Sequence, residues 1–217
     1  AVPPGKGEMI NYINWQLNEL EKLNVPVLME TEVTPELVKK EKPDVIFAAT
    51  GAVPIIPNIP GIDRPNVVTA HDVLSGKVNT GSRVVVVGGG CVGAETANQL
   101  ANYLKCVTII EMLDAIAEDE IVVPRWDLLE DLDRNKVRIC TKTTVDEITD
   151  AGVKVSGAVN EVIPCDTVVL AVGAKPVLGL ADALKKEGYD VRVIGDAAKV
   201  GLGGEAIMEG FEVGRTI

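Results

Sequence analysis

Three glycines, Gly88, Gly90 and Gly93, are the residues of this sequence whose spacing points most clearly to chemistry. They form the pattern G-x-G-x-x-G directly after residues 83–87, an apolar run typical of a buried strand, and before a helix-forming stretch. In such a turn the first glycine permits the sharp change of direction, the second lets a diphosphate approach the backbone, and the third lets the helix pack closely on the strand. The pattern predicts a dinucleotide site, and a simple tight turn is the alternative.

The helix that follows these glycines is expected to supply the groups that bind the anion. Its first residues, Cys91 and Val92, would present backbone N–H groups that have no partner inside the helix, at the positive end of the helix dipole. Both features favour a phosphate group at this position. The predicted site therefore does not depend on basic side chains.

An acidic residue follows the next apolar segment, residues 107–110, about 20 residues beyond the glycines. At this position, Glu111 would accept hydrogen bonds from an adenosine ribose. No arginine or lysine follows closely to hold a 2′-phosphate, and the carboxylate would repel one, so the sequence favours NAD(H) over NADP(H). A solvated charge at the end of a strand is the alternative.

An internal repeat indicates two related nucleotide-binding units. Residues 44–54 and 166–176 share the pattern Asp, an apolar strand, then Ala-x-Gly-Ala-x-Pro, with Gly51 and Gly173 at equivalent positions. Units of a strand and a glycine turn are common in parallel sheets, so the repeat alone does not establish kinship.

The remaining elements are expected from apolar periodicity and from Gly and Pro positions. Four prolines between residues 54 and 65 suggest a rigid crossing between domains. The expected helices are 8–23, 35–40 with Thr34 as the cap, and 126–132; the expected strands are 25–29, 44–49, 83–87, 107–110 and 137–140, followed by an antiparallel meander over 145–170.

Composition excludes several classes of function. The 217 residues carry a net charge of −11, which would repel nucleic acid, and no apolar run is long enough to span a membrane. The four cysteines show none of the close spacing of metal sites or redox pairs and are expected to be reduced, as in a cytoplasmic protein. His71, at the start of a short helix, is expected to have a capping or surface role rather than a role in catalysis.

The final stretch of the chain resembles the carboxyl-terminal FAD motif of the flavoproteins that have two dinucleotide-binding domains. The run Val-Ile-Gly-Asp-Ala ends with Asp196 and Ala197 and is followed by a glycine-rich loop over 201–204. The resemblance implies that Asp196 contacts the ribityl chain of FAD and that Thr50 and Gly51 also meet this cofactor. A Gly-Asp turn that closes a strand is the alternative.

The opening Pro3-Pro4-Gly5-Lys6, followed by the 8–23 helix, is similar to the carboxyl-terminal half of 2,4-dienoyl-CoA reductase, enoate reductase and trimethylamine dehydrogenase, the NADH:flavin oxidoreductase family. This resemblance implies an α/β fold: a Rossmann-like NAD(P)-binding domain with a β-meander insertion, plus an incomplete FAD-binding domain. The implied segments are 1–78 for part of the FAD domain, 79–189 for the NAD(P) domain, and 190–217 for the return to the FAD domain.

The family's activity implies that this chain is a fragment of an NAD(P)H-dependent flavin oxidoreductase. Its binding partners would be NADH and FAD. The intact protein would pass hydride from NADH to FAD, and electrons through an iron–sulfur cluster to FMN in a barrel of the same polypeptide, to reduce an activated C=C bond of an enoate or dienoyl-CoA. Glu95 would lie near the nicotinamide, and Gly173 would let the cofactor pass close to the backbone. No catalytic side chain or metal ligand is expected, and a homo-oligomer stays open.

Two other functions are compatible with parts of the pattern. A disulfide reductase of the thioredoxin-reductase type would need two neighbouring cysteines beside the flavin, which this sequence lacks. A non-catalytic module that binds an adenine nucleotide for structure, as in trimethylamine dehydrogenase, would keep the glycine loop without the redox step.

Overall fold

The structure, a computed structural model, describes residues 3–217 and contains two compact units. The first unit comprises Pro54–Gly173 with the described residues up to Glu19, and the second comprises Leu20–Val53 and Ala174–Ile217. These limits differ from the expected segments, which end at residues 78 and 189. Residues 54–78 belong to the first unit because they contribute a strand to its central sheet.

A five-stranded parallel sheet forms the centre of the first unit, with its strands in the order β3-β10-β4-β5-β6. Four consecutive residues of β4 and all four of β10 are buried, as in strands that are covered on both faces. The α/β fold and the expected strands at 83–87, 107–110 and 137–140 are confirmed. The strands are β3 (Val67–Thr69), β4 (Arg83–Val87), β5 (Cys106–Ile110), β6 (Arg138–Cys140) and β10 (Thr167–Leu170).

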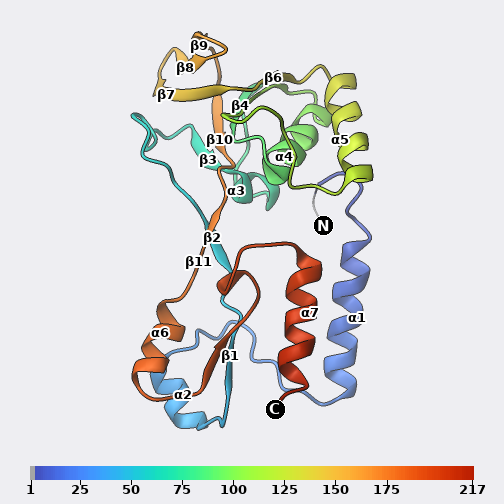
Figure 1. Ribbon diagram of the computed structural model, residues 1–217, viewed down its shortest axis with the longest axis vertical. Helices are drawn as coiled ribbons and strands as arrows, with labels where there is room; N and C mark the ends of the chain where they lie inside the picture. The colour runs from blue at the N-terminus through green and yellow to red at the C-terminus, as the bar shows by residue number, and fades with distance from the viewer. Residues whose placement is uncertain (1–2) are drawn as a thin grey trace. The chain divides into compact units, whose positions relative to one another are not determined.

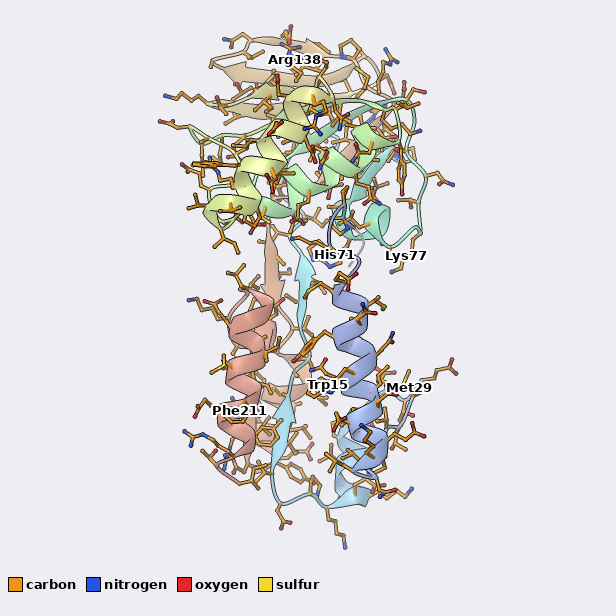
Figure 2. The ribbon with its side chains drawn as sticks, turned by 90° about the vertical axis from the view of Figure 1, so that its right-hand side faces the viewer. Trp15, Met29, His71, Lys77, Arg138 and Phe211 are labelled. Atoms are coloured by element: carbon orange, nitrogen blue, oxygen red, sulfur yellow. The ribbon has the colours of Figure 1, made fainter. Side chains whose placement is uncertain are left out.

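Helices α4 (Cys91–Asn102) and α5 (Val122–Arg134) pack against each other beside the sheet (Figure 1). Ala94 and Ala97 of α4 are completely buried among the strands, because their small side chains let the helix axis approach the sheet. Both helices confirm the sequence expectation. The short α3 (Ala70–Leu74) packs on α4 and carries the exposed His71 (Figure 2), in keeping with a surface role.

A three-stranded antiparallel meander, made of β7 (Thr143–Thr149), β8 (Gly152–Gly157) and β9 (Glu161–Ile163), buries its apolar side chains in a second cluster with residues of β4 and β10. The meander was expected to extend to residue 170, and this limit is wrong. β10 pairs with β3 and β4 instead, because four successive buried side chains need cover on both faces, which only the central sheet provides.

The second unit contains two small strand pairs and three helices, and its parallel strand pair and two of the helices enclose a separate apolar cluster. The Thr34 hydroxyl accepts a hydrogen bond from the Leu37 N–H at 3.3 Å, which confirms it as the cap of α2. The strands are β1 (Ile46–Ala48) with the parallel β12 (Val191–Val193), and β2 (Ala52–Pro54) with β11 (Ala174–Pro176); the helices are α2 (Pro35–Glu41), α6 (Gly179–Lys186) and α7 (Gly203–Gly214).

The internal repeat corresponds to matched elements. β2 and β11 occupy equivalent positions of the two copies, and β1 corresponds to the last residues of β10. Gly51 and Gly173, which are equivalent in the repeat, have φ angles of 70° and 97°. Side chains disfavour this left-handed region, so both copies require glycine at this turn.

The segment 25–29 is not a strand, contrary to expectation. Pro26 has no N–H to donate to a ladder, and the neighbouring apolar side chains are exposed, with Val25 at 45% and Met29 at 77%. The preceding helix is confirmed as α1 (Met9–Lys22), although none of its residues is buried, and Trp15 extends from its surface (Figure 2). Among residues 3–217, every helix is too short or too polar to cross a bilayer.

We expect Gly93→Ala to destabilise the protein by about 1–3 kcal/mol, because the packing of α4 on β4 leaves no room for a methyl group. A Cβ at this position would lie 2.0 Å from the Gly88 carbonyl oxygen. Urea denaturation followed by circular dichroism measures the free energy of unfolding. Gly90→Ala is the matched control, since its Cβ would make only ordinary contacts; equal stability of the two variants would contradict the packing argument.

Candidate functional site

The first and third glycines of the loop are required by the fold itself. Gly88 has a φ of 100°, and a Cβ there would lie 2.4 Å from the Ala171 carbonyl oxygen at the end of β10. A Cβ on Gly93 would lie 2.0 Å from the Gly88 carbonyl oxygen. The strand, the turn and α4 are therefore in van der Waals contact through backbone atoms, as the sequence motif predicts.

Gly90 is different, because the protein around it leaves room for a side chain. Its φ of −62° suits any residue, and the nearest atom to an added Cβ would be a carboxylate oxygen of Asp119 at 3.5 Å. Neither the backbone conformation nor the packing explains a glycine here. The space in front of Gly90, at the N-terminus of α4, is the place where the motif expects a diphosphate.

Glu111 is a buried carboxylate that contacts the glycine loop. One oxygen accepts a hydrogen bond from the Gly89 N–H at 2.6 Å, and the other accepts from the Leu113 N–H at 2.8 Å. Only 8% of the residue is exposed, so it is not a solvated charge at the end of a strand. Glu111 therefore connects the end of β5 to the turn after β4 and keeps a negative charge beside the loop.

A cavity of about 510 Å³ lies at the carboxyl ends of β4, β5 and β10. In an open parallel sheet, ligands bind at this edge, where the chain leaves neighbouring strands in different directions. Four residues singled out in the sequence line the cavity together, namely Gly88, Gly90, Glu111 and Gly173. The structure thus brings these distant positions to one place.

Other cavity-lining residues were not expected from the sequence. Ile55, Pro57 and Ile59 come from the proline-rich segment, and Met112 and Thr144 also contribute. The Ile55 N–H donates to the Gly173 carbonyl oxygen at 3.0 Å, so the segment is fixed against the turn after β10. The prolines indicated rigidity, but nothing in their spacing indicated that this segment would line the site.

A polar cluster surrounds the first turn of α4. The Cys91 thiol donates to Glu120 at 2.9 Å and lies 3.4 Å from Glu95, while the Lys6 ammonium forms an ion pair with Glu95 and lies 3.8 Å from Glu120. Cys91 and Glu95 are predicted site residues, whereas Lys6 and Glu120 add to the expected set. Val92, the remaining predicted residue of this turn, is 48% exposed.

The cluster keeps its thiol protonated. Burial and the hydrogen bond to Glu120 raise the pKa of Cys91 far above its usual value, and the charges of the two carboxylates act in the same direction. The same hydrogen bond lowers the pKa of Glu120. Burial acts to lower the pKa of Lys6, but the hydrogen bond and charge of Glu95 outweigh it, so the net shift is upward.

The cluster therefore holds a neutral thiol and an ammonium ion between two carboxylates. Ligand atoms of Cys91, Glu95 and Glu120 lie within 4.8 Å of one another, a spacing that a metal ion could use. The Lys6 ammonium already supplies positive charge to this group, and a thiol must lose its proton to become a strong metal ligand. The arrangement fits a hydrogen-bonding and charge-balancing role better.

The predicted residues of the second unit lie at one end of its parallel strand pair. Thr50 and Gly51 follow β1, and Asp196 and Ala197 lie in the 3₁₀ turn Gly195–Ala197 after β12. The Thr50 hydroxyl donates to the Val177 carbonyl oxygen at 2.5 Å. Parallel pairing places both turns at the carboxyl ends of the strands, so the structure brings these residues to the same edge.

A smaller cavity of about 240 Å³ adjoins Asp196. The carboxylate accepts a hydrogen bond from the Gly201 N–H at 3.2 Å, which orders the glycine-rich loop before α7. The Gly195 N–H donates to Glu209 of α7 at 2.7 Å. The Gly-Asp turn is therefore present, and it forms one wall of this cavity; the contact of Asp196 with FAD stays a prediction.

These features define a class of protein. A parallel sheet with a glycine loop at a helix N-terminus, a buried acid at the neighbouring strand end and a cavity over that edge is a dinucleotide-binding α/β fold. Residues 29–192 match the family model described as pyridine nucleotide-disulphide oxidoreductase, and the chain belongs to this family. The expected resemblance to FAD- and NAD-binding regions of flavin oxidoreductases is confirmed.

Relatives share this region as one part of longer proteins. Bilirubin reductase of Mediterraneibacter gnavus is 39% identical over 90% of this chain and 31% of its own length. Cinnamate reductase of Clostridium sporogenes is 31% identical over 100% of this chain and 33% of its own length. The solved complex of 2-naphthoyl-CoA reductase with 2-naphthoyl-CoA is 32% identical, has a TM-score of 0.94, and covers 100% of this chain and 33% of that one.

The chain thus spans about a third of the length of each of these three proteins. Its family description includes disulphide chemistry, but its four cysteines are all free.

We expect Cys91 to react with iodoacetamide at least about tenfold more slowly than the exposed Cys106 at pH 8, because its raised pKa keeps the thiolate scarce. Peptide mass spectrometry measures the two rates, and Cys106→Ser isolates the slower reaction. Glu120→Gln should accelerate alkylation of Cys91, since it removes one of the carboxylates that raise the pKa. Equal rates at the two cysteines would contradict this account.

Proposed function

We propose that the first unit binds NADH, with the diphosphate at the head of α4, and that the chain is the electron-input module of a flavin-dependent reductase. The observation that carries the proposal is the free space at Gly90. The fold explains the glycines at positions 88 and 93 but gives no reason for a glycine at position 90. A ligand that approaches the backbone supplies that reason.

Each residue of the proposed site has a binding role. The N–H groups of Cys91, Val92 and Gly93 precede the first hydrogen bond inside α4, which runs from Ala94 to the Gly90 carbonyl oxygen at 2.9 Å, and they would hold the diphosphate. Glu111 would accept hydrogen bonds from the adenosine ribose while it maintains the loop. Its negative charge favours NADH over NADPH.

The nicotinamide would reach Gly173 at the end of β10 and would pass near Glu95 of α4. Gly173 has no Cβ, and a Cβ built there would touch only a side-chain carbon of Ile55, at 3.7 Å, so the backbone at the end of β10 is open to a flat ring. Lys6 balances the charge of Glu95 and would keep it from repelling the cofactor. The protein orients the nucleotide, and no side chain has to act as an acid or base.

The second unit would hold part of FAD, the cofactor that accepts a hydride from NADH and passes electrons on. Asp196 would contact the ribityl chain, with Ala197, Thr50 and Gly51 beside it. The cavity next to Asp196 and the left-handed turn at Gly51 support this placement. A Cβ on Gly51 would meet no atom within 4 Å, so the edge is sterically open to a ligand.

The whole protein would reduce an activated C=C bond conjugated to a carbonyl group. Names of relatives such as cinnamate reductase and 2-naphthoyl-CoA reductase support a substrate of the enoate or acyl-CoA type. FMN and an iron–sulfur cluster would belong to other parts of the polypeptide. If the flavin of the intact protein stays oxidised when NADH is added without oxygen, a structural nucleotide module replaces this proposal.

We expect Gly90→Val to weaken NADH binding by at least about tenfold while the fold is retained, because the side chain would fill the space meant for the diphosphate. Isothermal titration calorimetry gives the dissociation constant, and circular dichroism checks the fold. Gly210→Ala in α7 is the control, since a Cβ there meets no other atom. Unchanged NADH affinity in folded Gly90→Val would remove the diphosphate from this loop.

We expect Met112→Arg to improve NADPH binding by about tenfold relative to NADH, because a guanidinium beside the ribose position can pair with a 2′-phosphate. Met112 is 68% exposed and lines the cavity next to Glu111, so the change leaves the hydrogen bonds of Glu111 intact. Met208→Arg on α7 is a control with the same charge. An unaltered NADPH to NADH ratio would place the ribose elsewhere.

A further inference from the structure

The loop that follows β5 contacts the head of α4 at three points. The Ala117 N–H donates to the Gly89 carbonyl oxygen at 2.7 Å, and a carboxylate oxygen of Asp119 accepts from the Cys91 N–H at 2.8 Å. Glu120 then accepts from the Cys91 thiol at 2.9 Å. The loop therefore lies directly against the glycine turn, on the helix side.

The middle contact coincides with the position proposed for the diphosphate. One oxygen of Asp119 takes the first N–H of α4, and the other lies 3.5 Å from the place where a Cβ of Gly90 would be. The carboxylate therefore borders the space that a glycine at position 90 leaves free. It satisfies the helix N-terminus with a negative charge, as a phosphate would.

We propose that Asp119 is a further residue of the nucleotide site, whose carboxylate competes with the nucleotide diphosphate for the Cys91 amide and so sets the affinity for nucleotides that contain a diphosphate. The inference rests on the proposed function. The Cys91 N–H points to one acceptor, and two anions at this distance would repel each other, so the diphosphate displaces the carboxylate.

The local structure allows this exchange without movement of the loop. Asp119 is exposed, whereas Ile116 and Ala117 are buried, with 4% and 1% of their surface accessible. The aspartate side chain can therefore turn to water while the loop stays attached through Ala117 and Glu120. The other charged groups at this turn are the carboxylates of Glu95, Glu111 and Glu120 and the ammonium of Lys6.

The test replaces the competing charge and keeps the shape. In Asp119→Asn, the amide oxygen can still accept from the Cys91 N–H, so α4 stays capped. We expect NADH and ADP to bind the 217-residue chain about threefold to tenfold more tightly than they bind the wild type. Asp119→Ser, a second neutral variant, should act in the same direction, and Glu118→Gln is the matched control because this neighbouring residue is exposed.

Calorimetric titrations of the wild type and the three variants separate the two hypotheses. If the wild type binds neither NADH nor ADP, the proposed function fails and this inference fails with it. If the wild type binds them but Asp119→Asn binds no more tightly than Glu118→Gln, the competing role of Asp119 is wrong while the nucleotide site stands. The inference is supported if both Asp119 variants bind NADH and ADP more tightly than the wild type and Glu118→Gln does not.

Discussion

The proposed nucleotide site depends on the close backbone contact between the first turn of α4 and the turn that follows β4. Because Gly93 has no side chain, the first turn of the helix lies against the Gly88 carbonyl group, and the helix axis points at the carboxyl edge of the sheet. The dipole of the helix and its first N–H groups, which have no partner inside the helix, are then directed to the same edge as the cavity. A larger residue would turn the helix away and separate these groups.

Glu111 has a structural role that is independent of any ligand. Its two oxygens hold the Gly89 and Leu113 N–H groups, so the carboxylate determines the shape of the loop before it contacts any ligand. A carboxylate oxygen has more than one lone pair, which leaves acceptor capacity toward a ribose. A substitution at Glu111 would therefore change the geometry of the loop as well as the preference between NADH and NADPH. Met112 makes neither of these hydrogen bonds, so it is the better position for testing the preference.

The sequence predicted the parts whose signals are local. Gly88, Gly93 and Glu111 belong to one strand-turn-helix-strand segment, and their spacing follows from its geometry. Ile55, Thr144 and Asp119 come from separate segments with no motif, so only tertiary packing shows that they reach the loop. The segment 25–29 has the apolar composition of a strand, but composition does not reveal whether a neighbouring strand is present to pair with it.

Four carboxylates, those of Glu95, Glu111, Asp119 and Glu120, hydrogen-bond to Gly89 or Cys91, and the Lys6 ammonium is paired among them. An anionic nucleotide must therefore diffuse toward the loop against a repulsive field. Added electrolyte shortens the reach of that field from about 30 Å at 0.01 M to about 8 Å at 0.15 M. Association should consequently quicken as ionic strength rises, opposite to the behaviour of phosphate sites built from lysine and arginine.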